Sequence, residues 1–324
     1  MAKYAIGIDI GGTNTKFGVV DENGHILIQD KLLTNSGEGV QDFIEELHTK
    51  LLPMIENAGG VKQFAGMGIG APNGNYYTGN IEYAANLKWK GIIPFAKMVS
   101  EKFGLKVKLT NDANAAAMGE MIYGCAKGMK HFITITLGTG VGSGIVIDGK
   151  IVLGHDGFAG ELGHTIIRPG GRLHKGTGVR GTLESYASAT GVRDTALEML
   201  TESPATKSLL RDYSINDLTS QSVYECAIKG DKIANKIFEF TGQILGEALA
   251  NFVMFSSPEA IVLFGGLTKA GDLIINPTRK AMEANLVQVF KNKVRLIFSE
   301  LKEADAAILG ASALVWEAPT NLHR

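Results

Sequence analysis

Short apolar runs separated by glycine-rich turns open the chain. Residues 4–10 and 14–20 are such runs, Gly11-Gly12-Thr13 separates them, and a third apolar stretch follows up to residue 33. Short runs of this kind, bounded by turn residues, are typical of buried strands. The pattern therefore predicts a hairpin followed by a third strand over residues 4–33.

Helical spacing of apolar residues follows this segment. In residues 40–57 the apolar side chains recur every three to four positions and so share one face; they are Val40, Phe43, Ile44, Leu47, Leu51 and Ile55. Similar spacing or composition predicts helices over residues 93–103, 112–121, 232–255 and 304–316. Apolar runs predict strands over 64–69, 106–109 and 260–264. Residues 154–181 are glycine-rich and are expected to form a loop.

The opening pattern occurs a second time near the middle of the chain. Residues 135–148 contain an apolar strand, a Gly/Thr turn, a second apolar strand and a second turn, as residues 8–21 do. Shifted by 127 positions, Gly11 falls on Gly138 and Asp21 on Asp148. The repeat predicts a duplicated α/β domain, with its two glycine-rich turns facing each other across a cleft.

The two turns have the composition of phosphate-binding loops. Glycine leaves the backbone N–H groups accessible, and threonine adds a hydroxyl that can reach a phosphate oxygen. A Walker-type spacing is absent, and the run from Gly138 to Gly144 continues into a predicted strand, whereas a dinucleotide motif must open a helix. Two simple tight hairpins are the alternative. The matched pair favours a nucleotide-dependent phosphotransferase.

Composition narrows the class of protein further. A chain of 324 residues suits two domains, and a formal net charge of −1 gives no reason to expect nucleic acid or an anionic membrane as partner. The two cysteines, Cys125 and Cys226, are too few for a disulfide framework or a cysteine-rich zinc site. No signal peptide or membrane-spanning pattern is evident, so we expect a cytoplasmic protein.

Asp112 is the candidate catalytic base. It follows a predicted strand within Thr110–Asn114, where its carboxylate can overhang a cleft. Phosphoryl transfer to a hydroxyl needs a base near the attacking oxygen, and a carboxylate can accept that proton. Asp112 would also be well placed to cap the helix that follows, which is the alternative. Asn111 beside it and the other motifs favour catalysis.

A second polar cluster contains Glu161, His164 and Glu184 in the glycine-rich region. Each sugar hydroxyl both donates and accepts hydrogen bonds, so a cluster of carboxylates and an imidazole suits a polyol. Ordinary surface residues and a structural histidine are the alternative. His155 and His174 lie close in sequence as well, but their spacing matches no compact zinc pattern.

Two further positions suit the nucleotide. Gly265-Gly266 ends an apolar run and would let a ribose or a flat ring approach the backbone, although a simple strand-to-helix turn is the alternative. Asp9 ends the first predicted strand. It could hold Mg²⁺, usually through water, or anchor the loop that follows.

Together these motifs resemble the ROK family of repressors and sugar kinases, within the actin-like ATPase superfold that includes the hexokinases. The resemblance covers nearly the whole chain and rests on residues 9–16, 71–74, 86–89, 111–114, 137–142 and 160–164. It implies two duplicated ribonuclease H-like α/β domains flanking a cleft. We expect a small domain of residues 1–120, with a C-terminal helix of about 304–324 packed back onto it, and a large domain of residues 121–303.

The resemblance also implies roles for individual residues. Asp112 is the base, and the residues expected to bind the sugar are Asn86, Asn111, Asp112, Glu161, His164 and Glu184. The residues expected to bind ATP, with Mg²⁺, are Asp9, Gly11, Gly12, Thr13, Lys16, Gly138, Thr139, Gly140, Gly265 and Gly266. The family also implies a homodimer.

One motif of the family is altered in this chain. The family usually has three cysteines before its last glutamate, and these bind zinc together with the motif histidine. Here His174, Gly176 and Thr182 stand where the cysteines would be. We therefore expect no zinc. The sequence does not tell what orders residues 170–184 instead.

The leading functional hypothesis is an ATP-dependent hexokinase that phosphorylates the 6-hydroxyl of glucose, a glucokinase. An N-acetylglucosamine or N-acetylmannosamine kinase is the first alternative and a fructokinase the next. A sugar-responsive repressor or a catalytically inactive sugar sensor is the alternative from outside the enzymes. The near-neutral charge and the predicted strand at about residue 4 argue against DNA binding.

Overall fold

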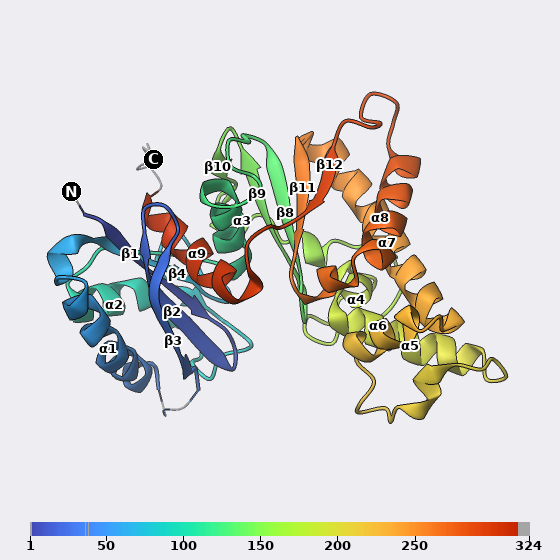
Figure 1. Ribbon diagram of the computed structural model, residues 1–324, viewed down its shortest axis with the longest axis horizontal. Coiled ribbons are helices and arrows are strands. Elements are labelled where there is room, and N and C mark those ends of the chain that lie inside the picture. Colours follow the sequence, from blue (N-terminus) through green and yellow to red (C-terminus); the bar gives the residue numbers. More distant parts are fainter. Residues whose placement is uncertain (1, 36, 38, 317–324) are drawn as a thin grey trace. The chain divides into compact units, whose positions relative to one another are not determined.

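The computed structural model in Figure 1 describes residues 2–35, 37 and 39–316. Its contacts divide the chain into two compact units. The first unit contains residues 1–130, 144–160 and 299–324, and the second contains residues 131–143 and 161–298. The predicted domain boundaries near residues 120 and 303 stay a prediction.

The first unit is built on a five-stranded sheet. In chain order its strands are β1 (Tyr4–Ile10), β2 (Asn14–Asp21), β3 (Ile26–Leu33), β4 (Phe64–Gly70) and β7 (Val107–Thr110). Their order in the sheet is β3-β2-β1-β4-β7. β2 pairs antiparallel with both β1 and β3, whereas β4 pairs parallel with β1 and β7. The predicted hairpin and third strand over residues 4–33 are confirmed.

Helices cover both faces of this sheet (Figure 1). α1 (Val40–Asn57) and α2 (Phe95–Phe103) bury their apolar sides in one core with the sheet residues. The predicted face of α1 is confirmed, because Phe43, Ile44, Leu47, Leu51 and Ile55 are all buried. α3 (Asp112–Ile122) and α9 (Glu303–Trp316) belong to smaller clusters that include Val20, Ile308 and Leu314.

Glycines let α9 pack directly on the sheet backbone. A Cβ on Gly7 of β1 would overlap the carbonyl oxygen of Ile308, and a Cβ on Gly68 of β4 would overlap that of Ala311. Only glycine allows so close an approach of helix and strand. The helix predicted over about residues 304–324 is present from Glu303 to Trp316. Residues 317–324 lie outside the described residues.

The second sheet repeats the strand order of the first. Its strands are β8 (Phe132–Leu137), β9 (Val141–Ile147), β10 (Lys150–Ile151), β11 (Ala260–Phe264) and β12 (Arg295–Phe298), in the order β10-β9-β8-β11-β12. β9 pairs antiparallel with β10, and β11 pairs parallel with β8 and β12. This topology confirms the duplicated α/β fold that the sequence repeat predicts.

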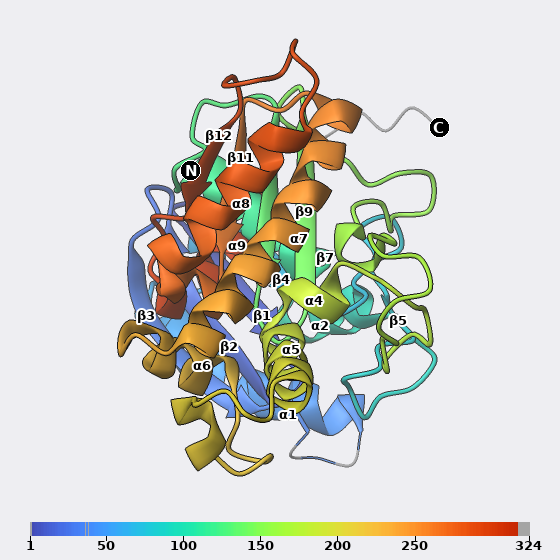
Figure 2. The same ribbon diagram turned by 90° about the vertical axis from the view of Figure 1, so that its right-hand side faces the viewer.

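The helices of the second unit gather around one long helix. α7 (Lys232–Ser256) and α8 (Asp272–Asn285) run side by side in Figures 1 and 2. The two helices approach closely at Gly246 of α7, because glycine has no Cβ, and a Cβ there would overlap the carbonyl oxygen of Thr278 in α8. α4 (Glu184–Ala187), α5 (Ala189–Glu202) and α6 (Ser220–Ile228) also contact α7.

The remaining elements of the described residues are short. β5 (Ile81–Glu82) and β6 (Ile92–Ile93) form a two-stranded sheet. The 3-10 helices are η1 (Val61–Gln63), η2 (Leu162–His164), η3 (Leu209–Asp212) and η4 (Gly266–Ala270). The glycine-rich segment 154–181 is mostly irregular, as predicted. Among the described residues, no helix is both long and apolar enough to cross a membrane.

Candidate active site

The first predicted phosphate loop, Gly11–Thr13, connects β1 to β2 in the first unit. Its carbonyls accept hydrogen bonds from the Thr34 N–H at 2.9 Å and from Asn35 Nδ2 at 2.7 Å. A Cβ on Gly12 would lie 3.1 Å from the carbonyl oxygen of Asn86. The turn is therefore fixed by its neighbours, and Asn86, which is expected to bind the sugar, lies directly against it.

Two carboxylates of the first unit flank a single glycine. A Cβ on Gly70, the last residue of β4, would lie 3.7 Å from Asp9 Oδ1 and 3.6 Å from the Cα of Asp112. Asp9 also pairs across the hairpin with Lys16. The ends of β1 and β7, which lie on either side of β4, thus bring the predicted magnesium-binding carboxylate and the predicted base into the same neighbourhood.

Both carboxyl groups are harder to ionise than an ordinary aspartate. The pKa of Asp9 is raised to about 7, chiefly by burial and also by the charge of Asp112, while Lys16 opposes the shift. Asp112 has solvent-accessible surface, yet the protein around its carboxyl displaces enough water that burial raises its pKa as well. Two neighbouring carboxyl groups with raised pKa values are typical of sites that bind cations or accept protons.

Asn111, not Asp112, caps helix α3. The Asn111 side-chain oxygen accepts the Asn114 N–H at 2.7 Å, whereas Asp112 is the first helical residue and accepts the N–H of its neighbour Ala113 at 2.8 Å. The helix cap is therefore provided without Asp112. The amide oxygen of Asn111 is engaged in the cap, so any hydrogen bond that its side chain donates to a sugar comes from Nδ2.

The second predicted phosphate loop, Gly138–Gly140, lies in the second unit and is held by the start of α5. The Ala189 N–H donates to the Gly138 carbonyl at 2.8 Å, and Thr190 Oγ1 donates to the Thr139 carbonyl at 3.1 Å. Gly265 packs behind this loop: its φ is +109°, and a Cβ there would lie 2.6 Å from the Leu137 carbonyl oxygen. The two predicted nucleotide segments of this unit therefore adjoin.

Glu184, a predicted sugar ligand, is bound to this loop. Its Oε2 accepts the Val141 N–H at 2.6 Å, and a Cβ on Gly140 would overlap the same oxygen. Its other oxygen, Oε1, lies 2.6 Å from His174 Nε2. The carboxylate thus connects the glycine-rich turn to the irregular segment that precedes α4.

The remaining sugar-side residues lie beside this pair. His164 Nδ1 lies 3.2 Å from Glu161 Oε2, and the ring of His164 lies 5.6 Å from that of His174, centroid to centroid. Glu161 and His164 are both exposed, at the beginning and the end of η2 respectively. The structure therefore brings Glu161, His164 and Glu184 together within the second unit, as the sequence predicts.

His164, His174 and Glu184 have donor atoms that all lie within 4.8 Å of one another, so this trio could hold a metal ion. The closed structural zinc site that the family implies does not fit these residues, because such a site has four ligands, commonly thiolates. Two imidazoles and one carboxylate are instead the ligand set of an open zinc site, which leaves a fourth position free. The His174 nitrogen that would face a metal is in contact with Glu184 itself.

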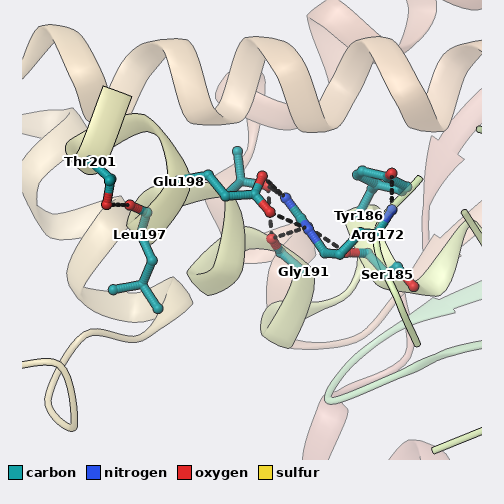
Figure 3. Close-up of polar contacts among 8 residues, drawn as sticks. Arg172, Ser185, Tyr186, Gly191, Leu197, Glu198 and Thr201 are labelled. Atoms are coloured by element: carbon teal, nitrogen blue, oxygen red, sulfur yellow. Dashed lines mark hydrogen bonds and ion pairs between the residues drawn. The ribbon is translucent and has the colours of Figure 1, made fainter. Parts of the chain in front are cut away.

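Arg172 secures the segment that precedes Glu184, as Figure 3 shows. Its guanidinium contacts both carboxylate oxygens of Glu198, at 2.9 and 2.6 Å, and Thr195 Oγ1 at 3.0 Å. It also donates to the carbonyls of Ser185 and Gly191 and lies 4.6 Å from the centre of the Tyr186 ring. One arginine thus ties the glycine-rich segment to α4 and α5.

Sequence reasoning missed the roles of Arg172 and His174. Counted back from Glu184, the family pattern places its cysteines at residues 175, 177 and 182, so the predicted match of His174 and Gly176 to cysteine positions is wrong by one residue. Nothing in the sequence paired His174 with Glu184. Arg172 carries no motif. The ion pair between Arg172 and Glu198 could be inferred only once the irregular segment is known to lie on α5.

The sequence profile of the ROK family matches residues 5–318. This chain belongs to the ROK family. A glucokinase of Halalkalibacterium halodurans is 33% identical to it over 325 residues, which cover 99% of this chain and 98% of that protein. The xylose repressor of Bacillus spizizenii is 29% identical and matches 98% of this chain but 78% of the repressor.

A solved ROK structure agrees with the sequence match. The ROK family glucokinase of Streptomyces griseus, crystallised in complex with glucose and AMPPNP, is 32% identical with a TM-score of 0.79. The match covers 96% of this chain and 98% of that one. The fold is thus that of the ROK sugar kinases, as the sequence motifs predict.

Proposed function

We propose that this ROK protein is a glucokinase that transfers the γ-phosphoryl group of ATP to the 6-hydroxyl of glucose. The observation that carries the proposal is its likeness, over nearly the whole chain, to a ROK glucokinase that binds glucose and AMPPNP. The polar groups described above supply chemistry that suits the reaction.

In this proposal Asp112 accepts the proton of the attacking hydroxyl. Because its pKa is raised, the carboxylate is a stronger base than an ordinary aspartate and is better matched to that proton. The helix cap is supplied by Asn111, so the Asp112 carboxylate is not required for it. Asn111 and Asn86 of the same unit donate to or accept from sugar hydroxyls.

The two glycine-threonine turns bind the phosphates of ATP through backbone N–H groups and threonine hydroxyls. Asp9 and Lys16 lie beside the first turn, where the carboxylate would hold a hydrated Mg²⁺ and the ammonium would contact phosphate. Magnesium bound there offsets the negative charge of the phosphates. Gly265 and Gly266, whose backbones have no side chain to cover them, contact the nucleoside.

Glu161, His164 and Glu184 hydrogen-bond the hydroxyls of the hexose. A hydroxyl donating to a carboxylate is a charge-assisted bond, and such bonds typically contribute about 1.5–3 kcal/mol each. These groups recognise hydroxyls that glucose shares with other hexoses. N-acetylglucosamine, N-acetylmannosamine and fructose therefore stay alternative substrates.

A sugar-binding repressor is the second candidate function, because the chain also matches the xylose repressor. A repressor would bind a sugar and a DNA operator without consuming ATP. We further propose a cytoplasmic homodimer, in keeping with the resemblance to the family. Light scattering of the purified protein tests the dimer.

A coupled ADP-release assay with MgATP tests the proposal. Glucose should be turned over in preference to N-acetylglucosamine, N-acetylmannosamine, mannose and fructose. Asp112→Asn should lower kcat by about a hundredfold or more while leaving glucose binding, measured by calorimetry, largely intact. Asp272→Asn is the matched control, because Asp272 is an exposed first residue of a helix in the second unit.

The outcomes separate the alternatives. Preference for an N-acetylated sugar would keep the reaction and replace the substrate. Sugar binding without turnover of any hexose would favour the sensor or repressor. Equal activity of Asp112→Asn and Asp272→Asn would remove Asp112 from catalysis.

A further inference from the structure

His174 is held by both of its ring nitrogens. Nε2 lies 2.6 Å from Glu184 Oε1, and Nδ1 lies 2.7 Å from Thr177 Oγ1. The side chains of His174 and Glu184 are only 17% and 18% exposed, although most of the surrounding segment is exposed. A half-buried imidazole with two partners has a single defined orientation.

The hydrogen-bond pattern assigns the direction of these contacts. Thr177 Oγ1 already accepts the Val179 N–H at 3.3 Å, so its own hydroxyl proton can be donated to His174 Nδ1. In the neutral ring the proton then sits on Nε2. That N–H faces the Glu184 carboxylate, which is the acceptor it requires.

The Glu184 carboxylate is fixed from its other side as well. Oε2 accepts the Val141 N–H, and Gly140 leaves no space between its backbone and that oxygen. The carboxylate therefore has one partner on each oxygen. Among the described residues, the contact from the glycine-rich turn would then be the one left to Glu184 without His174, and the carboxylate could rotate about it.

Backbone hydrogen bonds close the segment around His174. Its N–H donates to the Val179 carbonyl at 2.8 Å, and its carbonyl accepts the Gly178 N–H at 2.8 Å. The Gly181 N–H donates to the Arg172 carbonyl at 2.8 Å, and the Arg172 side chain is fixed on α5.

We propose that His174 is a positioning residue that holds Glu184 for hexose binding, and that it orders residues 172–184 without a metal ion. It would replace, by direct hydrogen bonding, the bound metal that the cysteine pattern provides in other family members. The part concerning the hexose rests on the proposed function. The part concerning loop order does not.

The kinetic test compares two substitutions. His174→Gln keeps an N–H at about the position of Nε2, whereas His174→Leu keeps the bulk and loses the donor. His174→Leu should raise KM for glucose about tenfold or more, because a hydrogen bond to a charged group is lost. Its kcat and its KM for ATP should change little, and His174→Gln should restore most of the glucose affinity. Equal KM values for His174→Leu and the wild type would overturn the positioning role.

Limited trypsin digestion tests the loop independently of activity. Lys175 and Arg180 are exposed cleavage sites within the segment. Cleavage there should be slow in the wild type with or without a chelator, and fast in His174→Leu. Thr177→Val, which keeps His174 but removes its Nδ1 partner, should give intermediate cleavage and confirm the effect in a second variant.

Elemental analysis of the purified protein completes the test. We expect no stoichiometric zinc. One zinc per chain, together with chelator-induced cleavage at Lys175 and Arg180, would overturn the metal-free account. Should the wild type turn over no hexose, the proposed function fails, while the digestion pattern still decides whether His174 orders the segment.

Discussion

Replacing Asp9 by asparagine should stabilise the first unit at alkaline pH. The same replacement should abolish the contribution to activity that is predicted for the Asp9 carboxylate. Asp9 is poorly hydrated and lies near Asp112, and Lys16 offsets its charge in part. Its carboxylate is therefore costly to maintain in the folded state. Asparagine has nearly the same shape and no charge, so the cost disappears.

The magnitude follows from the shift in pKa. The pKa of Asp9 rises from 3.8 in the unfolded chain to about 7 in the folded protein. A raised carboxyl pKa penalises the folded state increasingly as pH rises through the unfolded pKa, up to the folded pKa. At about 1.4 kcal/mol per unit the penalty reaches about 4 kcal/mol at about pH 8 as an upper limit, and about 2 kcal/mol at about pH 5.

Urea unfolding followed by tryptophan fluorescence measures the change in the free energy of unfolding of the first unit. Both tryptophans, Trp89 and Trp316, belong to the first unit, which also contains Asp9. The free energy of unfolding of Asp9→Asn relative to the wild type should increase by about 2 kcal/mol between about pH 5 and about pH 8. The kcat of the variant should fall, because the predicted magnesium contact is lost.

Asp30→Asn serves as the control of opposite sign. Asp30 Oδ2 lies 2.9 Å from Lys50 Nζ. This hydrogen bond is the largest of the causes that hold the pKa of Asp30 below its usual range. A depressed carboxyl pKa adds stability that is present above the unfolded pKa and lost in acid. Asp30→Asn should thus give no gain at alkaline pH. A benefit of Asp9→Asn that is absent, or that does not grow with pH, would refute the reasoning.

Three further predictions concern packing, the sugar side and pH. Gly68→Ala should destabilise the first unit by about 3 kcal/mol, because its Cβ would overlap the backbone of α9. Gly39→Ala is the control and should cost far less, because Gly39 has open space around it and a φ of −152°. Equal urea midpoints of the two variants would contradict this prediction. Gly140→Ala should raise KM for glucose by displacing Glu184, and an unchanged KM would argue against that contact. Because burial raises the pKa of Asp112, kcat/KM for glucose should decline in acid above the range of an ordinary aspartate; a decline only near pH 3.8 would oppose its role as base.

Local sequence patterns determined most of the secondary structure and the duplicated fold. The strand over residues 260–264 has the predicted bounds, and α1 begins and ends where its apolar spacing does. These features follow from the periods of strand and helix, which a sequence displays directly. The repeat of residues 8–21 at 135–148 likewise predicted a duplicated domain, which the matching strand orders of the two sheets confirm.

Other features were decided by tertiary structure alone. Asn111 rather than Asp112 caps α3, because the cap depends on the backbone angles where β7 ends, and both residue types suit that position. The shared neighbourhood of Asp9 and Asp112 requires β4 to pair in parallel with both β1 and β7. No local pattern states which strands pair.

The same limit applies most strongly to the segment around Glu184. Its contacts with Val141 and His174 span 43 and 10 positions of the sequence and involve irregular backbone without any period. The family resemblance identified Glu184 and the missing cysteines, and so raised the question of what orders this segment. The answer, His174 and Arg172, depends on where the loop backbone folds back onto α5. Since hydrogen bonds between irregular segments are fixed by that path rather than by spacing, only the tertiary structure could reveal them.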